Sequence, residues 1–406
     1  MKFSDFGLAD GVMEGLDAMG FEKPTPIQEQ AIPLAIAGKD VIGVAQTGTG
    51  KTAAFLLPVM SKISQSPDNN INALIIVPTR ELALQIDQAI QGFGYFAGVS
   101  SMAIYGGGDG AEFNAEKKAL MTGADIVVAT PGRLLSHLSL GYADFSKIDF
   151  LILDEADRML DMGFYADIMR IVKHCNVERQ SLLFSATMPP DILKLTRSIL
   201  KNPSEINIAV SKPAEGVMQC AYSVFNKQKV PLLAHLLRGK DLQSVIVFSS
   251  TKRMVAEIAR SLQRQKFNCD AISSDLEQDD REKVMLGFRN RTIQILVATD
   301  VVSRGIDIED IDLVVNFDVP GDAEDYVHRV GRTARASKTG IAITLINPED
   351  QGKFAKIEKL IEMEIRKLGV PEQFGESPAY NPNAGNRSRE KRPFHGKKRP
   401  NKSAKR

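Results

Sequence analysis

The chain has 406 residues, of which 43% are apolar and 25% charged, and 51 basic and 50 acidic residues give a net charge of +1. This length and composition are ordinary for a globular protein of two or three domains. No apolar run approaches the roughly eighteen residues of a membrane span. The cysteines Cys175, Cys220 and Cys269 lie too far apart for a zinc or disulfide framework. We therefore exclude a membrane-spanning or disulfide-stabilised protein, and expect buried free thiols in a reducing cytoplasm.

The charge is distributed unevenly along the chain. Ten of the basic residues and one of the acidic residues lie between Arg387 and Arg406, so this tail carries +9 and the remaining chain −8. A tail of this kind commonly binds a polyanion. It is equally typical of a disordered end that only adds solubility.

Residues 1–40 are predicted to be helical and irregular, and from residue 41 onward strand-like apolar runs alternate with segments of helical length. The strands expected in the first half are 41–45, 73–77, 100–104, 126–129, 150–153, 181–184 and 205–208. The clearest helices between them are 81–91, 111–121 and 191–200. This alternation predicts a mainly parallel sheet with both faces covered by helices.

Residues 210–216 interrupt the alternation and read as a linker between an N-terminal domain of residues 1–209 and a C-terminal domain of residues 217–368. The second half has expected strands at 219–225, 245–248, 269–272, 293–297, 313–316 and 342–345. Its expected helices are 229–237, 253–265, 279–288 and 354–365. Residues 375–406 lack apolar periodicity and are predicted to be a disordered basic tail.

A phosphate-binding loop is indicated at residues 45–52, with the sequence AQTGTGKT between an apolar strand and a helix. Glycines let successive backbone amides turn toward phosphate oxygens, and the helix adds its positive end. In such a loop Lys51 reaches the β- and γ-phosphates and the Thr52 hydroxyl holds Mg²⁺. The usual pattern begins with Gly where Ala45 stands.

Asp154, Glu155 and Asp157 directly follow the expected strand 150–153, at the end of the sheet where ligands bind. We expect Asp154 to hold Mg²⁺ through its water shell. Glu155 is placed to orient or deprotonate the attacking water. Acids are also common at the start of a helix for reasons unrelated to catalysis.

Further stretches occur in an order found in one family. The first half has GFEKPTPIQ at 20–28, PTRELA at 78–83, GG at 106–107, TPGR at 130–133 and SAT at 185–187. The second half has Gln278 with Arg281, ATD at 298–300, RGID at 304–307 and HRVGRTAR at 328–335. Together with 45–52 and 154–157, they resemble DEAD-box ATP-dependent RNA helicases over residues 3–368. The family usually has Gly where Ala334 stands, and Ala tolerates helical geometry better than Gly.

The resemblance implies an α/β protein of two tandem RecA-like domains with ATP and Mg²⁺ as cofactors. It places adenine recognition at Phe21 and Gln28, although Phe21 alone would suggest ordinary core packing. The ATP-binding residues that it implies are Phe21, Thr25, Gln28, Ala45, Gln46, Thr47, Gly48, Thr49, Gly50, Lys51, Thr52 and Asp307.

RNA contacts are implied at several turns between strand and helix. Thr and Pro at such turns are good helix starts whatever else they do, and a row of helix N-termini also suits the phosphates of a nucleic-acid backbone. The residues concerned are Pro78, Thr79, Arg80, Gly107, Thr130, Arg133, Thr299 and Arg304.

Arg332 and Arg335 are expected to place positive charge on the phosphoryl group in transfer, supplied from the second domain, so that domain closure completes catalysis together with Lys51, Asp154 and Glu155. The resemblance assigns Ser185 and Thr187 to coupling between ATP state and strand separation, although both could simply cap a helix. His328 and Arg329 are expected to bridge the domains. His137 and His235 are predicted to be structural.

We therefore expect an ATP-dependent RNA helicase that unwinds or remodels short RNA duplexes and RNA–protein complexes. An ATP-gated RNA clamp, or an RNA-binding scaffold with little unwinding activity, is the alternative, and use of DNA stays open. Backbone contacts predict little sequence preference. A bacterial protein is expected from the short basic tail and the absence of a targeting segment. A cytoplasmic location is expected because the first residues lack the apolar core of a signal peptide. Ribosome-assembly or RNA-decay complexes are partners that the tail could reach; no membrane is expected.

Removal of the basic tail is expected to weaken RNA binding more than basal ATP hydrolysis, because its contribution is nonspecific and electrostatic. The measurement is RNA affinity at physiological salt for the full chain and for a chain ending at Gly375. Equal affinities of the two proteins would contradict the expectation.

Overall fold

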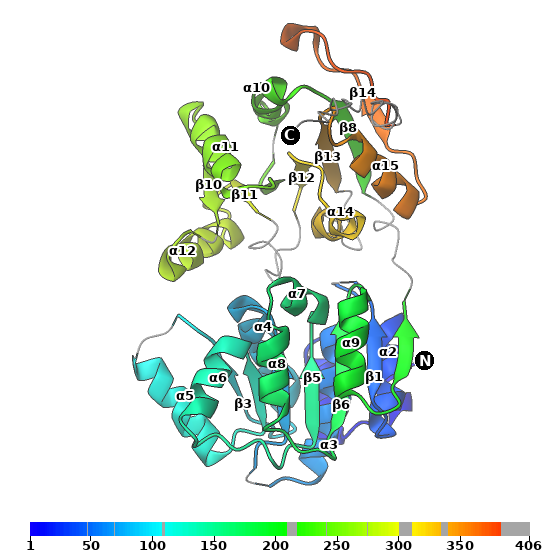
Figure 1. Ribbon diagram of the computed structural model, residues 1–406, viewed down its shortest axis with the longest axis vertical. Coiled ribbons are helices and arrows are strands. Elements are labelled where there is room, and N and C mark those ends of the chain that lie inside the picture. The colour runs from blue at the N-terminus through cyan, green and yellow to red at the C-terminus, as the bar shows by residue number, and fades with distance from the viewer. Residues whose placement is uncertain are drawn as a thin grey trace, which may run out of the picture. The chain divides into compact units, whose positions relative to one another are not determined.

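The computed structural model describes residues 1–46, 48–68, 70–107, 110–208, 217–240, 242–273, 275–299, 311–333 and 340–382. The chain forms two compact units, the first built mainly from residues up to 212 and the second mainly from residues after it (Figure 1). Within the described residues, no helix is long and apolar enough to cross a bilayer.

The first unit is built on a seven-stranded sheet in the order β3-β4-β2-β5-β6-β1-β7, with every neighbouring pair parallel. Its strands are β1 (Val41–Val44), β2 (Ala73–Ile76), β3 (Ser101–Ile104), β4 (Ile126–Ala129), β5 (Phe150–Leu153), β6 (Gln180–Ser185) and β7 (Ser204–Asn207). Because all strands run the same way, every strand ends at one common edge, and the loops after the strands share that edge.

Helices cover both faces of this sheet. Successive residues of one strand alternate between two cores, as Ile75 and Ile76 of β2 do. One core takes side chains from η1 (Phe3–Phe6), α1 (Asp10–Ala18), α2 (Pro26–Ile36), α3 (Lys51–Gln65) and α4 (Arg80–Gly94). The other takes them from α5 (Gly110–Thr122), α6 (Pro131–Ser139), α7 (Ala156–Asp161), α8 (Tyr165–Val172) and α9 (Pro190–Ile199), of which α8 and α9 lie in front in Figure 1.

The second unit repeats this plan with the order β10-β11-β9-β12-β13-β8-β14, again with every pair parallel. Its strands are β8 (Met218–Ser223), β9 (Val245–Phe248), β10 (Cys269–Ile272), β11 (Ile295–Ala298), β12 (Leu313–Asn316), β13 (Ile341–Ile346) and β14 (Arg366–Leu368). The prediction of two α/β units with parallel sheets is thereby confirmed.

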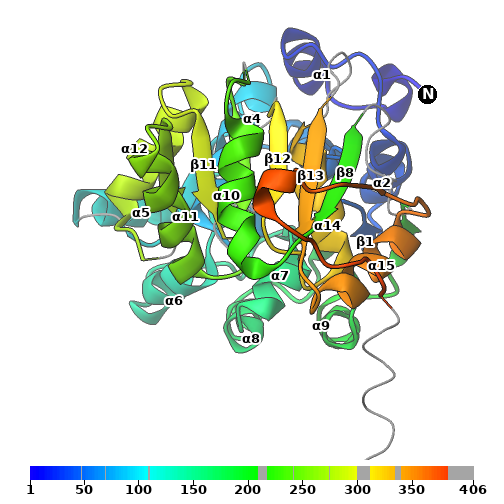
Figure 2. The same cartoon turned by 90° about the horizontal axis from the view of Figure 1, so that it is seen from above.

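The helices of the second unit also pack on both faces of their sheet. They are α10 (Asn226–Leu237), α11 (Lys252–Arg264), α12 (Gln278–Arg289), α14 (Ala323–Val330), α15 (Gln351–Leu360) and the short η2 (Gly331–Thr333) and η3 (Glu372–Phe374). Helices α10 and α11 share one core, and α14 and α15 share another. Figure 2 shows β11, β12, β13 and β8 in a row, with α10 in front of them.

Each predicted strand is confirmed to within two residues at either end. The predicted helix 354–365 is wrong at its C-terminal end, because α15 stops at Leu360 and β14 follows. Glu362 adopts the left-handed conformation with φ 52°, which ends the helix. Ile361 and Ile365 are both buried and continue the apolar spacing of the helix, so periodicity alone could not reveal the break.

The predicted start of disorder at Gly375 is also wrong for residues 375–382, which pack on the second unit. The Gln228 amide donates to the carbonyls of Phe374 and Glu376 over 2.8 and 2.9 Å. The Tyr380 hydroxyl donates to Glu358 over 2.8 Å, and its ring meets the edge of Phe354. The truncation proposed above is therefore best placed after Pro382. The expected linker 210–216 and residues 383–406 lie outside the described residues.

Tyr380→Ala is expected to destabilise the second unit by about 2 kcal/mol, because it removes a half-buried ring and its hydrogen bond. Lys367 lies 4.5 Å from the centre of this ring and would also lose a contact. Urea unfolding measures the change. Tyr95→Ala is the matched control, because the Tyr95 side chain is 79% exposed. Equal effects of the two substitutions would show that residues 375–382 add no stability.

Candidate functional site

Three stretches of the first unit meet where neighbouring strands end. Strand β6 lies between β1 and β5 in the sheet, so the residues that follow these strands share one edge. The predicted phosphate loop follows β1, Asp154 follows β5, and Ser185 ends β6. The amide of Ala45 donates to the carbonyl of Ser185 over 3.0 Å, which fixes the start of the loop to β6. The fold thus brings the predicted nucleotide residues to the edge where such ligands bind.

The loop depends on glycine at two described positions. Gly48 and Gly50 have φ values of 82° and 89°, in the left-handed region that favours glycine. A Cβ atom on Gly50 would lie 2.4 Å from the Gln28 amide nitrogen and 3.0 Å from the Thr25 hydroxyl. Gly50 is therefore required both by its backbone conformation and by the close approach of α2. Helix α3 begins immediately after it, at Lys51.

The loop contains a buried positive charge and unpaired polar groups, which suit an anionic ligand. The buried Lys51 ammonium donates to the carbonyl of Ala45 over 2.8 Å, so a positive charge lies inside the loop. Among the described residues, the Gln46 amide nitrogen and the Thr25 hydroxyl are buried without a hydrogen-bond partner. Unpaired buried donors are unfavourable unless a ligand or water satisfies them, so these residues fit a bound nucleotide. Ala45 is 1% exposed and packs in the core, which accommodates its methyl group.

Two carboxylates follow β5 in different surroundings. Asp154 is 3% exposed, and burial raises its pKa to about 6 although the neighbouring Lys51 opposes the shift. Glu155 has φ 50° and ψ 49°, a left-handed conformation unusual for a side chain other than glycine. Its carboxylate lies 3.3 Å from the Arg158 guanidinium. The backbone therefore turns sharply after Asp154, and Arg158 restrains the carboxylate that was predicted to act on water.

The described residues contain no group of three or more His, Cys, Asp or Glu side chains arranged around a metal position. Asp154 and Thr52 supply one carboxylate and one hydroxyl. This small set suits Mg²⁺, which usually keeps several waters and takes further oxygens from phosphates.

Asp157 joins the end of β5 to the turn after β6. One of its carboxylate oxygens accepts from the amides of Ala186 and Thr187 over 3.1 and 2.9 Å and from the Thr187 hydroxyl over 2.9 Å. The Ser185 hydroxyl accepts from the Asp157 amide over 3.2 Å. The N-cap residue of helix α9 is Pro189. The alternative that Ser185 and Thr187 simply cap this helix is therefore wrong.

The predicted adenine residues are packed closely against the protein. Gln28 is 1% exposed; its carbonyl oxygen accepts from the Thr25 amide over 2.9 Å and its nitrogen donates to the Gly50 carbonyl over 3.0 Å. Phe21 meets Phe93 edge to face, with ring centres 5.2 Å apart. Gln28 therefore contacts the phosphate loop itself. The adenine roles of Gln28 and Phe21 stay predictions, and packing accounts for part of the Phe21 surface.

The predicted RNA-binding turns of the first unit also share one edge, because β3, β4 and β2 are neighbours. Pro78 and Thr79 precede α4, and the Thr79 hydroxyl accepts from the Leu82 amide over 3.3 Å as its N-cap. Gly107 has φ 96° in the turn after β3. Thr130 is the N-cap residue of α6. Two helix N-termini and a glycine turn therefore lie along this edge, as the sequence predicts.

The two arginines of these turns are held by neighbouring aromatic rings. The Arg80 guanidinium lies 4.4 Å from the centre of the Tyr105 ring. Arg133 lies 4.6 Å from the Phe113 ring and pairs with Glu116 at 2.7 Å. Only 14% of the Arg133 side chain is exposed. Arg133 is therefore turned toward α5, whereas the sequence predicted a cation that lines the RNA path; its RNA contact stays a prediction.

In the second unit, Arg329 is 3% exposed and its guanidinium donates to the Asn316 side chain and to the Asp318 carbonyl, each over 3.0 Å. Asp318 also pairs with the buried Lys229 at 2.9 Å. Burial alone would raise the pKa of Asp318, but Lys229 and hydrogen bonds from Ser249 and Ser250 outweigh burial and lower it. These contacts of Arg329 are internal to its unit.

Thr299 follows β11 and is 7% exposed. His328 on α14 and Arg332 in η2 are half-buried. The expected roles of these three residues, and the bridging role of Arg329, stay predictions. Thr47, Arg304, Asp307 and Arg335 lie outside the described residues.

The two histidines predicted to be structural both have internal partners. His137 is fully buried and bonded to Glu116 and Tyr142. His235 packs against Phe374.

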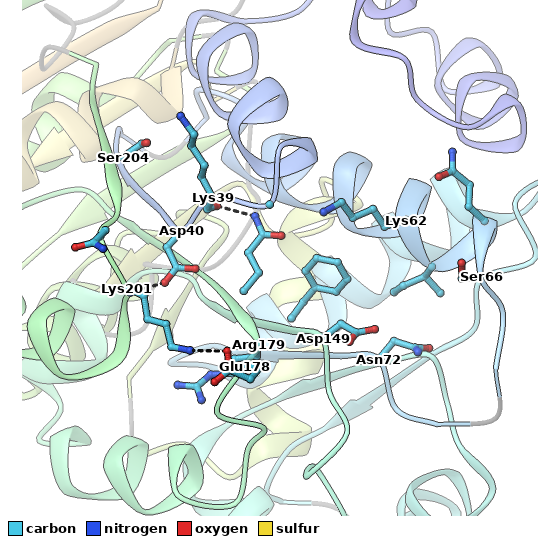
Figure 3. A pocket seen from close by; sticks show the side chains of 16 residues that line it. Lys39, Asp40, Lys62, Ser66, Asn72, Asp149, Glu178, Arg179, Lys201 and Ser204 are labelled. Atoms are coloured by element: carbon cyan, nitrogen blue, oxygen red, sulfur yellow. Dashed lines mark hydrogen bonds and ion pairs between the residues drawn. The ribbon is translucent and has the colours of Figure 1, made fainter.

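A cavity of about 830 Å³ opens at the opposite edge of the first sheet, near the strand starts (Figure 3). The Asp40 carboxylate in its wall accepts from the amides of Ser181 and Lys201 over 2.8 and 2.6 Å. The Lys201 ammonium pairs with Glu178 at 3.2 Å. These polar groups bond to one another and to the backbone near the starts of the strands. None of the predicted nucleotide residues lines the cavity. The phosphate loop therefore stays the candidate nucleotide site.

Comparison with known proteins matches both units. The family described as DEAD/DEAH box helicase matches residues 25–195, and the helicase conserved C-terminal domain matches residues 228–337. The chain is 43% identical over 371 residues to the ATP-dependent RNA helicase CshA of Listeria monocytogenes, covering 91% of this chain and 71% of that protein. The chain belongs to the DEAD/DEAH box helicase family. The predicted family and its enzyme class, the ATP-dependent RNA helicases, are thereby confirmed.

Further relatives support membership of the DEAD/DEAH box helicases. The chain is 41% identical over 373 residues to CshA of Bacillus subtilis, covering 91% of this chain and 74% of that one. Among solved structures, S. cerevisiae Dbp5 bound to RNA and ADP BeF3 matches with a TM-score of 0.81 and 29% identity, covering 91% and 95% of the two chains. A DEAD box protein from Methanococcus jannaschii matches with a TM-score of 0.54 and 39% identity, covering 91% and 99%.

The sequence assigned no individual role to three residues that the structure connects to the candidate sites. Asp157 is the last residue of the motif at 154–157, and its position two residues after Glu155 places it at the same sheet edge. Arg158 lies three residues after Glu155 on the first turn of α7, a spacing that allows an ion pair. Glu116 lies on α5 outside every motif. Only the fold shows that its carboxylate faces Arg133.

Asp154→Asn is expected to stabilise the nucleotide-free protein while abolishing Mg²⁺-dependent ATP hydrolysis. Because the pKa of Asp154 rises from 3.8 to about 6 on folding, the folded protein holds this proton more tightly than the unfolded chain. Wild type therefore loses stability as pH rises from 3.8 to about 6, by up to about 3 kcal/mol. The Asp154→Asn variant has no carboxylate at this position, so its stability does not change with pH in this range for this reason.

The measurement is urea unfolding of both proteins at several pH values without nucleotide. The stability advantage of Asp154→Asn should grow between about pH 4 and pH 6 and then stay constant. Glu178→Gln, which changes a carboxylate that is 84% exposed, should show no such growth. An advantage independent of pH would contradict the assigned burial effect.

Proposed function

We propose that this protein unwinds or remodels short RNA duplexes and RNA–protein complexes and couples this work to ATP hydrolysis. The observation that carries the proposal is the bonding of Asp157 to the turn at Ser185 and Thr187. This contact joins the strand end that bears the catalytic acids to the stretch expected to couple ATP state to RNA. A nucleotide-dependent movement of either strand end would therefore displace the other through these hydrogen bonds.

In the proposed nucleotide site, Lys51 and the backbone amides of the loop bind the phosphates of ATP. The unpaired Gln46 and Thr25 groups support binding of a ligand here. Thr52 and Asp154 would hold Mg²⁺, which supplies charge neutralisation on the phosphates when bound. The burial of Asp154 supports this role, because a buried carboxylate gains most from a nearby cation.

Glu155 is proposed to orient the attacking water and accept its proton. Its left-handed backbone fixes the direction in which the side chain leaves β5, and Arg158 restrains the carboxylate at 3.3 Å. Arg332 and Arg335 are proposed to act on the transferred phosphoryl group, as the resemblance implies. His328 and Arg329 keep their expected coupling roles within this proposal, and Phe21, Gln28 and Asp307 their expected roles toward adenosine.

RNA is proposed to lie along the edge formed by the turns after β2, β3 and β4. The helix N-termini of α4 and α6 and the turn at Gly107 support this path, because exposed backbone amides suit phosphate oxygens. Thr299 and Arg304, from the second half of the sequence, keep their expected roles toward RNA in this proposal. The yeast relative Dbp5, by its description, binds RNA together with ADP BeF3. Contacts of this kind give little sequence preference.

The cellular setting is also a proposal. We propose a cytoplasmic protein whose basic tail adds salt-sensitive affinity for RNA and reaches ribosome-assembly or RNA-decay complexes. The charge of +9 on residues 387–406 supports an anionic partner.

The deciding experiment is ATP hydrolysis with and without single-stranded RNA, for wild type and Glu155→Gln, together with unwinding of a short RNA duplex. RNA should raise the wild-type rate and DNA should raise it little. Glu155→Gln should lower the RNA-stimulated rate by on the order of a hundredfold or more, because a positioned base contributes at least that much. Nucleotide binding should persist in the variant.

Glu178→Gln is the matched control, because it removes an exposed carboxylate at the other edge of the same sheet and should leave each rate unchanged. RNA-stimulated hydrolysis without duplex unwinding would favour the clamp. A rate indifferent to RNA and DNA would contradict the helicase proposal and favour a scaffold.

A further inference from the structure

Helix α5 carries a buried carboxylate that the proposed nucleotide and RNA sites do not include. Glu116 is 4% exposed. One of its oxygens accepts from the Arg133 Nε atom over 2.7 Å and is bonded to His137 Nε2 at 2.8 Å, while the other accepts from the Tyr105 amide over 3.4 Å. A buried carboxylate is tolerated only when it is paired and hydrogen-bonded, and Glu116 meets this condition through three partners on two other segments.

The partners of Glu116 belong to the turns that line the proposed RNA path. Tyr105 directly precedes the glycine turn at 106–107. The Arg80 guanidinium lies over the Tyr105 ring, 4.4 Å from its centre. Arg133 and His137 lie on α6, whose N-terminus is one of the proposed phosphate contacts. A single carboxylate therefore connects the turns after β3 and β4 directly, and the turn after β2 through the Tyr105 ring.

A second residue of α5 fixes the orientation of the same groups. The Phe113 ring stacks on His137 with centres 4.3 Å apart and an interplanar angle of 14°. The Arg133 guanidinium lies over the same ring at 4.6 Å. The guanidinium is thus held at Nε by a carboxylate and on its face by a ring, which leaves it little rotational freedom.

We propose that Glu116 is a positioning residue for RNA binding, which acts by holding the Arg133 guanidinium in the orientation that binds the RNA backbone. It makes no RNA contact of its own. The inference rests on the proposed function. It predicts that loss of the carboxylate weakens the hold on RNA without impairing hydrolysis once RNA is bound, because the phosphate loop and Asp154 lie on other strands.

The test compares wild type, Glu116→Gln, Arg133→Met and the double variant. The RNA concentration that gives half-maximal ATP hydrolysis should rise about tenfold in Glu116→Gln, the loss expected for a charged hydrogen bond. The maximal rate at saturating RNA should stay close to wild type. Because Glu116 acts through Arg133, the double variant should be little worse than Arg133→Met alone. Glu178→Gln changes charge equally, away from these turns, and should match wild type.

The remaining results would overturn the inference in distinguishable ways. An unchanged half-maximal RNA concentration in Glu116→Gln would show that the carboxylate does not position the RNA site. A fall in the maximal rate and in nucleotide binding, with a lower melting temperature, would show a general structural role. Additive effects in the double variant would show that Glu116 does not act through Arg133. Absence of RNA stimulation in wild type would remove the proposed function, and this inference with it.

Discussion

The parallel pairing of β1, β6 and β5 is the constraint on which the first unit depends. Because these strands run side by side in the same direction, the phosphate loop, the Ser185 turn and the Asp154 carboxylate must end at one edge. The neighbouring strands β2, β4 and β3 bring the predicted RNA-binding turns to the same edge. One sheet therefore positions both candidate sites, and Asp157 bonds the end of β5 to the turn after β6.

Largely buried pairs of opposite charge recur in both units. Lys51 and Asp154 lie close to each other in the candidate nucleotide site, and the raised pKa of Asp154 reflects burial that a bound cation would relieve. Glu116 and Arg133 form a second, largely buried pair beside the proposed RNA path, and Lys229 with Asp318 forms a third in the second unit. Such pairs contribute modestly to net stability. Their geometric value is that each fixes the direction of a functional or adjoining side chain.

The sequence predicted the strands well because a parallel sheet covered on both faces requires short, continuous apolar runs. It erred where a tertiary contact opposed local periodicity. The spacing of Ile361 and Ile365 continues a helix, yet Glu362 turns the chain so that residues 366–368 pair with β8. Residues 375–382 lack apolar periodicity, yet the bonds of Tyr380 and Gln351 hold them to the second unit.

The sequence by itself determined the fold class, the family and the identity of most candidate residues, because glycine turns, strand-end acids and their order along the chain are local features. The tertiary structure alone decided which partners those residues have. It turned Arg133 toward Glu116, placed Gln28 on the phosphate loop and made Asp157 the bond between two strand ends. The physical reason is that side-chain partners come from segments far apart in the sequence, and only packing of the sheet and helices brings them within hydrogen-bonding distance.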